Sequence, residues 1–305
     1  MNYTLHQLQV FLKIVQTKSI TKAAVELYLT QPAVSIQMKN FQNQFEIPLT
    51  EVVGRQLYIT DFGQEIAVMA ERIINDVYAI NYQTLAYKGI LSGMLKIAIV
   101  STGKYIMPYF LAGFLKKNPG IDLKMDVTNK AGVLKSLEKN EVDFALVSVM
   151  PEGMALKEEI LLENKLYLVG NKDMTHKGKP YDKSIFEKIP LIYREEGSGT
   201  RLVMESFFEK SKVKVLKKLE LTSNEAVKQA VIAGLGYSVM PLIGIHNELE
   251  SGELQIIPVS GLPVKSAWRL IRLENKKQSL AAEAFLETVK KEKNQVLEMY
   301  FSWAV

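Results

Sequence analysis

The stretch that decides the fold of the N-terminal region is ITKAAVELYLTQPAVSIQMKNF, residues 20–41. Ser19 is the predicted N-cap of a first helix. Ala23 and Ala24 of this helix are small, so the backbone of a second helix can cross it closely. Thr30 is the predicted N-cap of that second helix. Pro32 is tolerated in its first turn because the N–H groups there have no helical partner. The stretch therefore predicts two helices joined by a short turn.

The second of these helices has two distinct faces. At about 100° per residue, Val34, Met38 and Phe41 form one apolar stripe, and mostly short polar side chains lie opposite. A helix that presents such side chains from its N-terminal end, after a short turn, is the helix-turn-helix arrangement that reads a DNA major groove. The predicted DNA contacts on this helix are Gln31, Pro32, Ser35, Ile36 and Lys39.

The flanking residues extend this pattern on both sides. Apolar residues at 8, 11, 12 and 15 predict a preceding helix over residues 5–17. The segment VVGRQLYIT, residues 52–60, has a glycine turn between alternating apolar positions, which predicts a β-wing with Arg55 at its tip as a sixth DNA contact. Spacing alone leaves open a small helical packing domain whose polar face is merely solvated, because this geometry also occurs in proteins that do not bind DNA.

The composition narrows the class of protein. A chain of 305 residues suggests two or more domains, and the absence of cysteine excludes disulfides, thiolate metal sites and a cysteine nucleophile. The N-terminus lacks the basic region of a signal peptide, so we expect a cytoplasmic protein. Residues 229–247 are free of charge, but their glycines, proline and polar residues predict a helix, a turn and a buried strand, with no membrane span.

Net charge gives little evidence for a nucleic-acid partner. The chain carries +5 overall, but residues 1–60 hold only five basic and three acidic side chains. The prediction of DNA binding therefore depends on the pattern of residues 20–41 and not on bulk charge.

A long helix is predicted after the wing. No proline or glycine interrupts residues 64–88, and the apolar positions recur at intervals of three and four. The helix is near coiled-coil length, and its apolar stripe is Ile66, Met69, Ile73, Val77 and Ile80. The alternative is a helix that packs only on its own domain.

From Met94 the pattern changes to alternating strands and helices, which predicts α/β structure with parallel sheets. Ligands in such folds bind beyond the carboxyl ends of the strands. The predicted binding residues at those ends are Ser101, Thr102, Thr128, Ser148, Ser198, Thr200 and Arg201. Hydroxyls, a helix start and one arginine favour a small organic or phosphorylated anion. The alternative for residues 198–201 is a plain capped helix start.

Several of these motifs together resemble LysR-type transcriptional regulators. The N-terminal match rests on Ala23-Ala24, TQPAVSIQM (31–38 with its preceding Thr30) and LYIT-DFG (57–63). Two later motifs, REEGSGTR (194–201) and AGLGYSVMP (233–241), resemble the branch that regulates carbon-fixation and cysteine-biosynthesis genes.

The resemblance implies an α+β multidomain protein. It implies a winged helix-turn-helix at 1–62, a linker and dimerisation helix at 63–91, and a two-lobed α/β effector domain at 92–305 that is similar to periplasmic binding proteins. The apolar stripe of residues 66–80 would then be the dimerisation stripe. Lobe I would comprise 92–161 and 268–305, and lobe II 162–267. The implied partners are double-stranded DNA with a two-fold-symmetric site, a small anionic effector, and further copies of the chain in homodimers and homotetramers.

The chain also departs from the usual family pattern. Phe41-Gln42 stands where Leu-Glu is usual, and Glu46 where glycine is usual. Many members carry a basic residue at the position of Ile36, which suggests an apolar contact here, such as one to a thymine methyl group.

Nothing in the sequence indicates catalysis. The histidines, His6, His176 and His246, have no metal-ligand spacing, and the chain has neither a GxSxG elbow nor a Walker A loop. We therefore expect a ligand-responsive transcription regulator with no enzymatic activity, metal or cofactor. The alternative is a two-lobed α/β enzyme or solute-binding protein with a helical appendage, although a transported-solute receptor would need a secretion signal.

Overall fold

The computed structural model describes residues 2–54, 56–87, 89–173 and 180–304, so the predicted wing contact Arg55 lies outside the described residues. The chain divides into two compact units, Met1–Gly89 and Ile90–Val305. Each unit has its own hydrophobic core.

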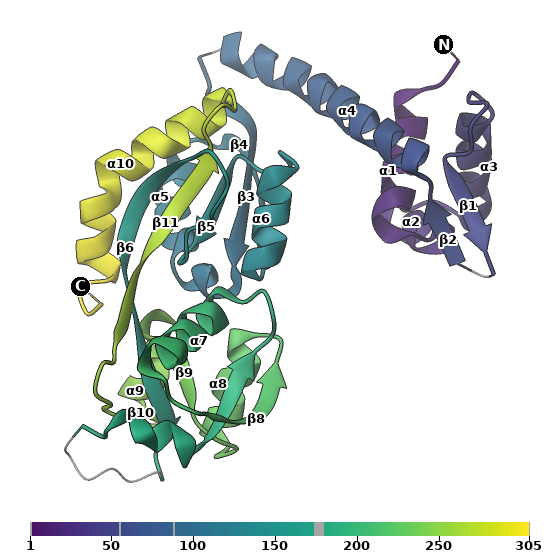
Figure 1. The fold of residues 1–305 in the computed structure, drawn as a ribbon. Coiled ribbons are helices and arrows are strands. Elements are labelled where there is room, and N and C mark those ends of the chain that lie inside the picture. Colours follow the sequence, from purple (N-terminus) through teal and green to yellow (C-terminus); the bar gives the residue numbers. More distant parts are fainter. Residues whose placement is uncertain (1, 55, 88, 174–179, 305) are drawn as a thin grey trace. The chain divides into compact units, whose positions relative to one another are not determined.

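The N-terminal unit has the predicted order of elements (Figure 1). The Ser19 and Thr30 hydroxyls accept hydrogen bonds from the N–H groups of Lys22 and Ala33, so both predicted N-caps are confirmed. The elements are α1 (Leu5–Thr17), α2 (Ile20–Glu26), α3 (Gln31–Gln42), the antiparallel hairpin β1 (Thr50–Val53) and β2 (Gln56–Ile59), and α4 (Asp61–Tyr87).

The core of this unit explains the unusual Phe41-Gln42 pair. Phe41 is fully buried, and its ring centroid lies 5.2 Å from that of Phe11 and 5.1 Å from that of Phe45. The Gln42 side chain accepts a hydrogen bond from the Leu49 N–H at 2.6 Å and donates one to the Ile47 carbonyl at 3.2 Å. An amide can do both, whereas an ionised glutamate only accepts, so Gln42 holds both ends of the segment that enters the wing.

Helix α1 is buried on a broader face than the sequence pattern predicts. Leu8 and Phe11 are buried as expected, but Val10 and Ile14 are completely buried as well. The reason is that α1 contacts α2, α3 and α4, so more than one stripe of the helix is covered.

The long helix α4 has 27 residues and divides its apolar side chains between two uses. Ala67, Ala70 and Ile74 pack into the core of the N-terminal unit. Met69 and Ile73, from the predicted dimerisation stripe, are 58% and 39% exposed in the single chain. The stripe also contains Ile66 and Val77, which are half-buried, and Ile80, which is 67% exposed.

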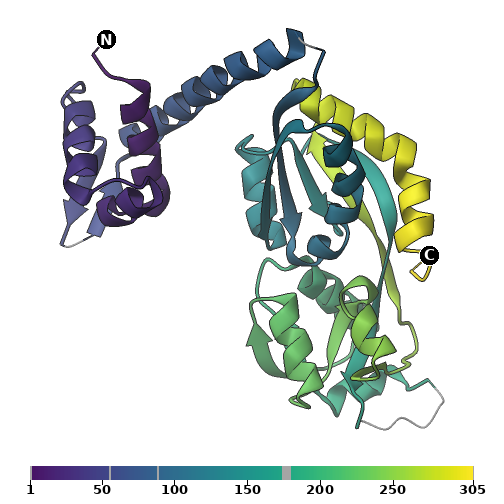
Figure 2. The same cartoon turned by 180° about the vertical axis from the view of Figure 1, so that it is seen from behind.

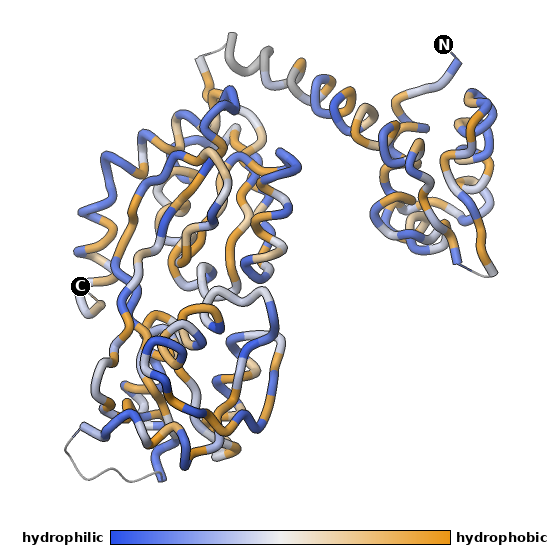
Figure 3. The backbone as a smooth tube through the Cα atoms, in the orientation of Figure 1, coloured by the Kyte–Doolittle hydropathy of each residue, from blue (hydrophilic) through white to orange (hydrophobic). Residues whose placement is uncertain are grey.

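In the C-terminal unit, lobe I is built on a parallel arrangement of β4, β3 and β5. Helices α5 and α10 cover one face of these strands and α6 covers the other (Figures 1 and 2). Hydrophobic residues are concentrated in the central strands β3 and β5 (Figure 3). The elements are β3 (Ser92–Val100), the 3-10 helix η1 (Ser101–Tyr105), α5 (Met107–Lys117), β4 (Gly120–Thr128), α6 (Lys130–Glu138), β5 (Phe144–Val147) and α10 (Leu280–Tyr300).

Lobe II has separate hydrophobic clusters on the two sides of its strands. Its parallel pair β7 and β8 is linked to the strand region before β9 by a bridge between Leu191 and Tyr237. The elements are η2 (Lys183–Glu187), β7 (Pro190–Arg194), α7 (Gly199–Ser211), β8 (Leu216–Leu221), α8 (Asn224–Ile232), β9 (Ser238–Pro241), η3 (Leu242–Gly244), α9 (His246–Glu250) and β10 (Leu254–Ile256).

Two long strands, β6 (Leu156–Asn171) and β11 (Val264–Leu273), connect the lobes. Leu162 of β6 belongs to the core of lobe I, and Leu166 belongs to that of lobe II. The two strands pair antiparallel, and the sheet order is β10-β6-β11-β5-β3-β4, with β9 also on β6. The prediction of parallel sheets is therefore right only for strands that are joined by helices. The strands β6 and β11 pass between the lobes in opposite directions without a crossover helix, so they pair antiparallel.

The charge-free segment 229–247 contains the end of α8, a turn and the fully buried strand β9, as predicted, followed by η3 and the start of α9. Gly234 supports this turn with a φ of 78°. Across the described residues, no helix is both long enough and apolar enough to cross a membrane.

Candidate functional site

The outer face of α3 carries the predicted DNA contacts. Gln31, Pro32 and Lys39 are exposed, Ile36 is 58% exposed, and Ser35 is half-buried. The opposite face of α3 is in the core. The helix therefore presents a short row of polar side chains with one exposed aliphatic group, as a helix that inserts into a major groove does.

A second candidate site lies between the two lobes of the C-terminal unit. The parallel strands β3 and β5 end at the same edge of lobe I, and β7 of lobe II ends at Arg194 beside them. The residues that line the cavity are Val100, Ser101, Thr102, Asn129, Lys130, Ser148, Arg194, Ser198, Gly199 and Thr200. Five of the predicted residues thus come together there: Ser101, Thr102, Ser148, Ser198 and Thr200.

The predicted Thr128 does not line the cavity. Its hydroxyl packs behind the first turn of α6, where a Cβ added to Gly132 would lie 2.7 Å from the Thr128 Oγ1. The next two residues take its place. Asn129 is the N-cap of α6 and accepts a hydrogen bond from the Gly132 N–H at 3.0 Å, and Lys130 begins the helix.

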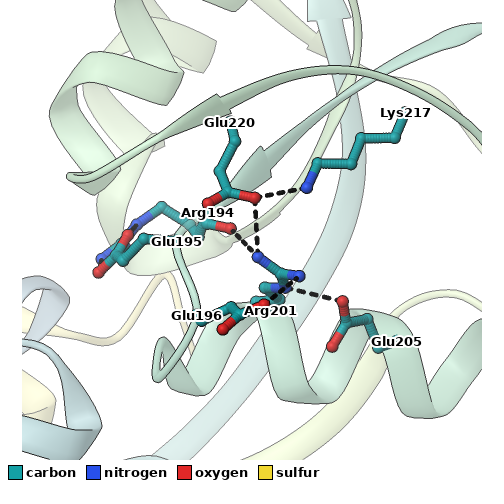
Figure 4. A network of polar contacts seen from close by, with 7 residues as sticks. All are labelled: Arg194, Glu195, Glu196, Arg201, Glu205, Lys217 and Glu220. Atoms are coloured by element: carbon teal, nitrogen blue, oxygen red, sulfur yellow. Dashed lines mark hydrogen bonds and ion pairs between the residues drawn. The ribbon is translucent and has the colours of Figure 1, made fainter.

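Arg201 also lies outside the cavity, which corrects the expectation from sequence. Its Nε donates to Glu205 at 2.7 Å, and its Nη1 donates to Glu220 at 3.0 Å and to the Arg194 carbonyl at 3.2 Å (Figure 4). Glu196 lies 3.8 Å from the Arg201 Nη2. Three carboxylates thus surround the guanidinium, and the one on Glu220 joins α7 to β8. The hydrogen bonds and charges of Glu205 and Glu220 raise the pKa of Arg201.

Arg194 is the arginine that reaches the cavity. It is only 4% exposed, and its Nη1 donates a hydrogen bond to the Ser101 hydroxyl of lobe I at 3.2 Å. Its Nε and Nη2 donate to the two carboxylate oxygens of Glu195, at 2.8 and 2.9 Å. The sequence did carry a signal for this residue, because an arginine at the end of a buried strand run, PLIYR, is rare without a function or a partner.

Lys130 supplies the second positive charge. Burial lowers the pKa of Lys130, and the nearby Glu152 carboxylate acts in the opposite direction. A partly desolvated ammonium group at the N-terminal end of α6 gains stability from a bound anion. Ser198 adds a buried hydroxyl, since it occupies the N-cap position of α7 without making a capping hydrogen bond.

The cavity can bind an anion, but little free space is left inside it. The space left inside is about 10 Å³, which is roughly the room needed for a single water molecule. The groups around it are hydroxyls, helix N-termini and cations, which bind anions reversibly. Among the described residues, no group of three or more metal-ligating side chains comes together.

A winged helix-turn-helix joined to a two-lobed α/β domain with a polar inter-lobe cavity defines a ligand-binding transcription regulator. Residues 5–64 match the bacterial regulatory helix-turn-helix proteins of the lysR family, and residues 88–294 match the LysR substrate binding domain. The chain belongs to the LysR family of DNA-binding transcription regulators.

Its relatives include known regulators of similar length. The HTH-type transcriptional activator CmpR of Synechocystis sp. is 36% identical over 289 residues, which cover 94% of each chain. A RuBisCO operon transcriptional regulator of Allochromatium vinosum is 36% identical over 290 residues, covering 95% of this chain and 96% of the relative.

Two solved structures are informative. The regulatory domain of Synechocystis PCC6803 CcmR in complex with 2-PG is 32% identical, with a TM-score of 0.62, and covers 69% of this chain and 98% of that one. Full-length CbnR complexed with its target DNA has a TM-score of 0.71 over 94% of this chain and 99% of that one. At 19% identity it shows a shared fold.

Proposed function

We propose that this chain regulates carbon-fixation genes in response to a small phosphorylated anion that binds between lobes I and II. The observation that carries the proposal is the convergence of Arg194 and Lys130 with hydroxyls from both lobes on one cavity. The similarity to RuBisCO operon regulators and to a CcmR domain bound to 2-PG supports the choice of pathway and ligand class.

The ligand that fits these groups carries a phosphate and a second small polar group. A phosphate would be held by Arg194, Lys130 and the N-terminus of α6, and the hydroxyls of Ser101, Ser148 and Thr200 would hold a carboxylate. 2-Phosphoglycolate (2-PG) has both groups. Calorimetric titration of the full chain should show binding of 2-PG and much weaker binding of glycolate, which lacks the phosphate. Equal affinities for the two would contradict the proposed ligand class.

The same proposal assigns roles to the domains. Residues 1–62 bind DNA, residues 63–91 pair two chains through the exposed part of the α4 stripe, and residues 92–305 bind the effector. Two identical DNA-binding heads suit a two-fold-symmetric DNA site, and further contacts between effector domains would make a homotetramer. A regulator of chromosomal genes acts in the cytoplasm.

Base readout is assigned to the outer face of α3. We expect Ser35→Ala to weaken binding to a selected specific DNA site by about 1 to 3 kcal/mol, because a base-edge hydrogen bond is lost. Its affinity for unrelated DNA should stay unchanged, since that affinity comes from phosphate contacts. Fluorescence anisotropy with both DNAs at one fixed salt concentration measures the two effects.

Lys39→Ala is the matched comparison on the same face. It should weaken binding to both DNAs by a similar factor if Lys39 contacts a phosphate. If Ser35→Ala binds the specific site as tightly as the wild type, Ser35 does not contact a base.

A further inference from the structure

The loop that follows β7 binds Arg194, one of the residues that line the cavity, although Glu195 and Gly197 do not line the cavity themselves. Both oxygens of the Glu195 carboxylate accept hydrogen bonds from Arg194, at 2.8 and 2.9 Å. The pair is well shielded, with side chains that are 5% exposed for Arg194 and 14% for Glu195. This is the two-pronged geometry with which an arginine binds a phosphate or a carboxylate ligand.

The same loop covers the start of α6. The Gly197 carbonyl accepts a hydrogen bond from the Ala131 N–H at 3.2 Å. That N–H is one of the helix-start donors that have no partner within the helix and that favour an anion. Gly197 has a φ of 81°, and a Cβ at this position would lie 2.9 Å from the Ala131 Cβ, so only glycine permits this approach.

Residues 195–197 therefore present a carboxylate and a carbonyl oxygen to two donors from opposite lobes. The space left beside these groups is about 10 Å³, which is less than a phosphorylated acid occupies. We propose that Glu195–Gly197 is an internal competitor of the effector, and that the anionic group of the effector binds Arg194 by displacing the Glu195 carboxylate. This inference rests on the proposed function, because it concerns the same cavity.

Displacement gives the loop a regulatory role. Without effector, the Gly197 contact and the Arg194–Ser101 hydrogen bond tie lobe II to lobe I. With effector, the anion replaces the loop on Arg194 and α6, so the two states differ in their contacts between the lobes. Such a difference in contacts is what allows a ligand to shift the population of two conformations.

A different role for Glu195 predicts the opposite result. If Glu195 only held the Arg194 guanidinium in place for the effector, its removal would weaken binding. If Glu195 competes with the effector, removal of its charge strengthens binding. A merely structural role gives no gain in affinity, so the sign of the change separates the two roles.

The test uses Glu195→Gln in the full chain, titrated calorimetrically with 2-PG and separately with inorganic phosphate. We expect Glu195→Gln to bind both anions about tenfold more tightly than the wild type, which corresponds to one charge-assisted interaction that no longer has to be broken. Glu205→Gln is the matched control, because it removes the same charge from a partner of Arg201 outside the cavity. It should change both affinities by less than about twofold.

Glu195→Asp gives a second, milder variant. It keeps the charge but is one methylene too short to hold both donors, so we expect a smaller gain in affinity, with thermal melting confirming that each variant is folded. Unchanged or weaker binding of phosphate by folded Glu195→Gln would overturn the competitor role. If the wild type and Glu195→Gln both fail to respond to 2-PG while phosphate shows the expected gain, the competitor role stands and the proposed effector is wrong.

Discussion

Arg194→Gln is expected to lower the affinity for 2-PG by about 2 to 4 kcal/mol, or at least about thirtyfold. Arg194 is the buried arginine of the inter-lobe cavity, and glutamine cannot supply its charge or its pair of parallel N–H donors. The variant should still bind specific DNA in the absence of effector, because the predicted base contacts lie on α3 in the N-terminal unit. Calorimetry with 2-PG and anisotropy with DNA measure the two quantities.

Arg201→Gln is the matched control for this experiment. It removes the same type of side chain seven positions further along the chain, but that side chain is bound to Glu205 and Glu220 and does not line the cavity. We expect its affinity for 2-PG to remain close to that of the wild type. A large loss in Arg201→Gln with no loss in Arg194→Gln would reverse the assignment and restore the simpler expectation from sequence.

The double variant Ile73→Glu with Ile80→Glu is expected to dissociate the dimer and to lower the affinity for a two-fold-symmetric DNA site by at least about a hundredfold. Both side chains are exposed on α4, at 39% and 67%, and two buried carboxylates in each helix would oppose pairing. The large loss of DNA affinity follows because two linked heads bind far more tightly than one. Light scattering and DNA anisotropy test the two parts of this prediction.

Val68→Glu with Tyr78→Glu provides the control. Both residues are also exposed apolar side chains of α4, but they lie on the other side of the helix from Ile73. This variant should remain dimeric and bind DNA normally. A dimeric Ile73→Glu/Ile80→Glu protein with unchanged DNA affinity would place the interface elsewhere.

The helices and the wing of the N-terminal unit could be predicted with their caps, because the signals for these elements are local. Ser19 and Thr30 cap helices through their own side chains, and the spacing of Val34, Met38 and Phe41 alone determines which face of α3 is buried. The dual hydrogen bonding of Gln42 could not be predicted, because it depends on the path of the segment before the wing.

The cavity could be predicted only in part. The rule that ligands lie beyond strand ends correctly brings together the hydroxyls of both lobes, because it depends on parallel strands such as β3 and β5. Which of Arg194 and Arg201 reaches the cavity depends on contacts between elements. Arg201 does not reach it because carboxylates, one of them on another element, already bind its guanidinium. Glu220 comes from β8, and no sequence spacing places it beside Arg201.

The length and pairing of the strands that connect the lobes also could not be predicted from the sequence pattern. Residues 166–170 read as a short strand, whereas β6 runs for 16 residues and serves both cores. Residues 156–166 of β6 pair with β11, about a hundred residues away in sequence, and polar residues such as Asn164 interrupt the apolar pattern there. Such long-range pairing overrides local periodicity.

Effector-dependent DNA binding is tested most directly by selecting genomic fragments with the full chain and measuring their affinity and footprint with and without 2-PG. We expect specific fragments with a two-fold-symmetric site beside carbon-fixation genes, and a footprint or affinity that changes with 2-PG in the wild type but not in Arg194→Gln. Specific fragments whose footprint and affinity are the same with and without 2-PG, or are changed equally in Arg194→Gln, would contradict regulation through this cavity.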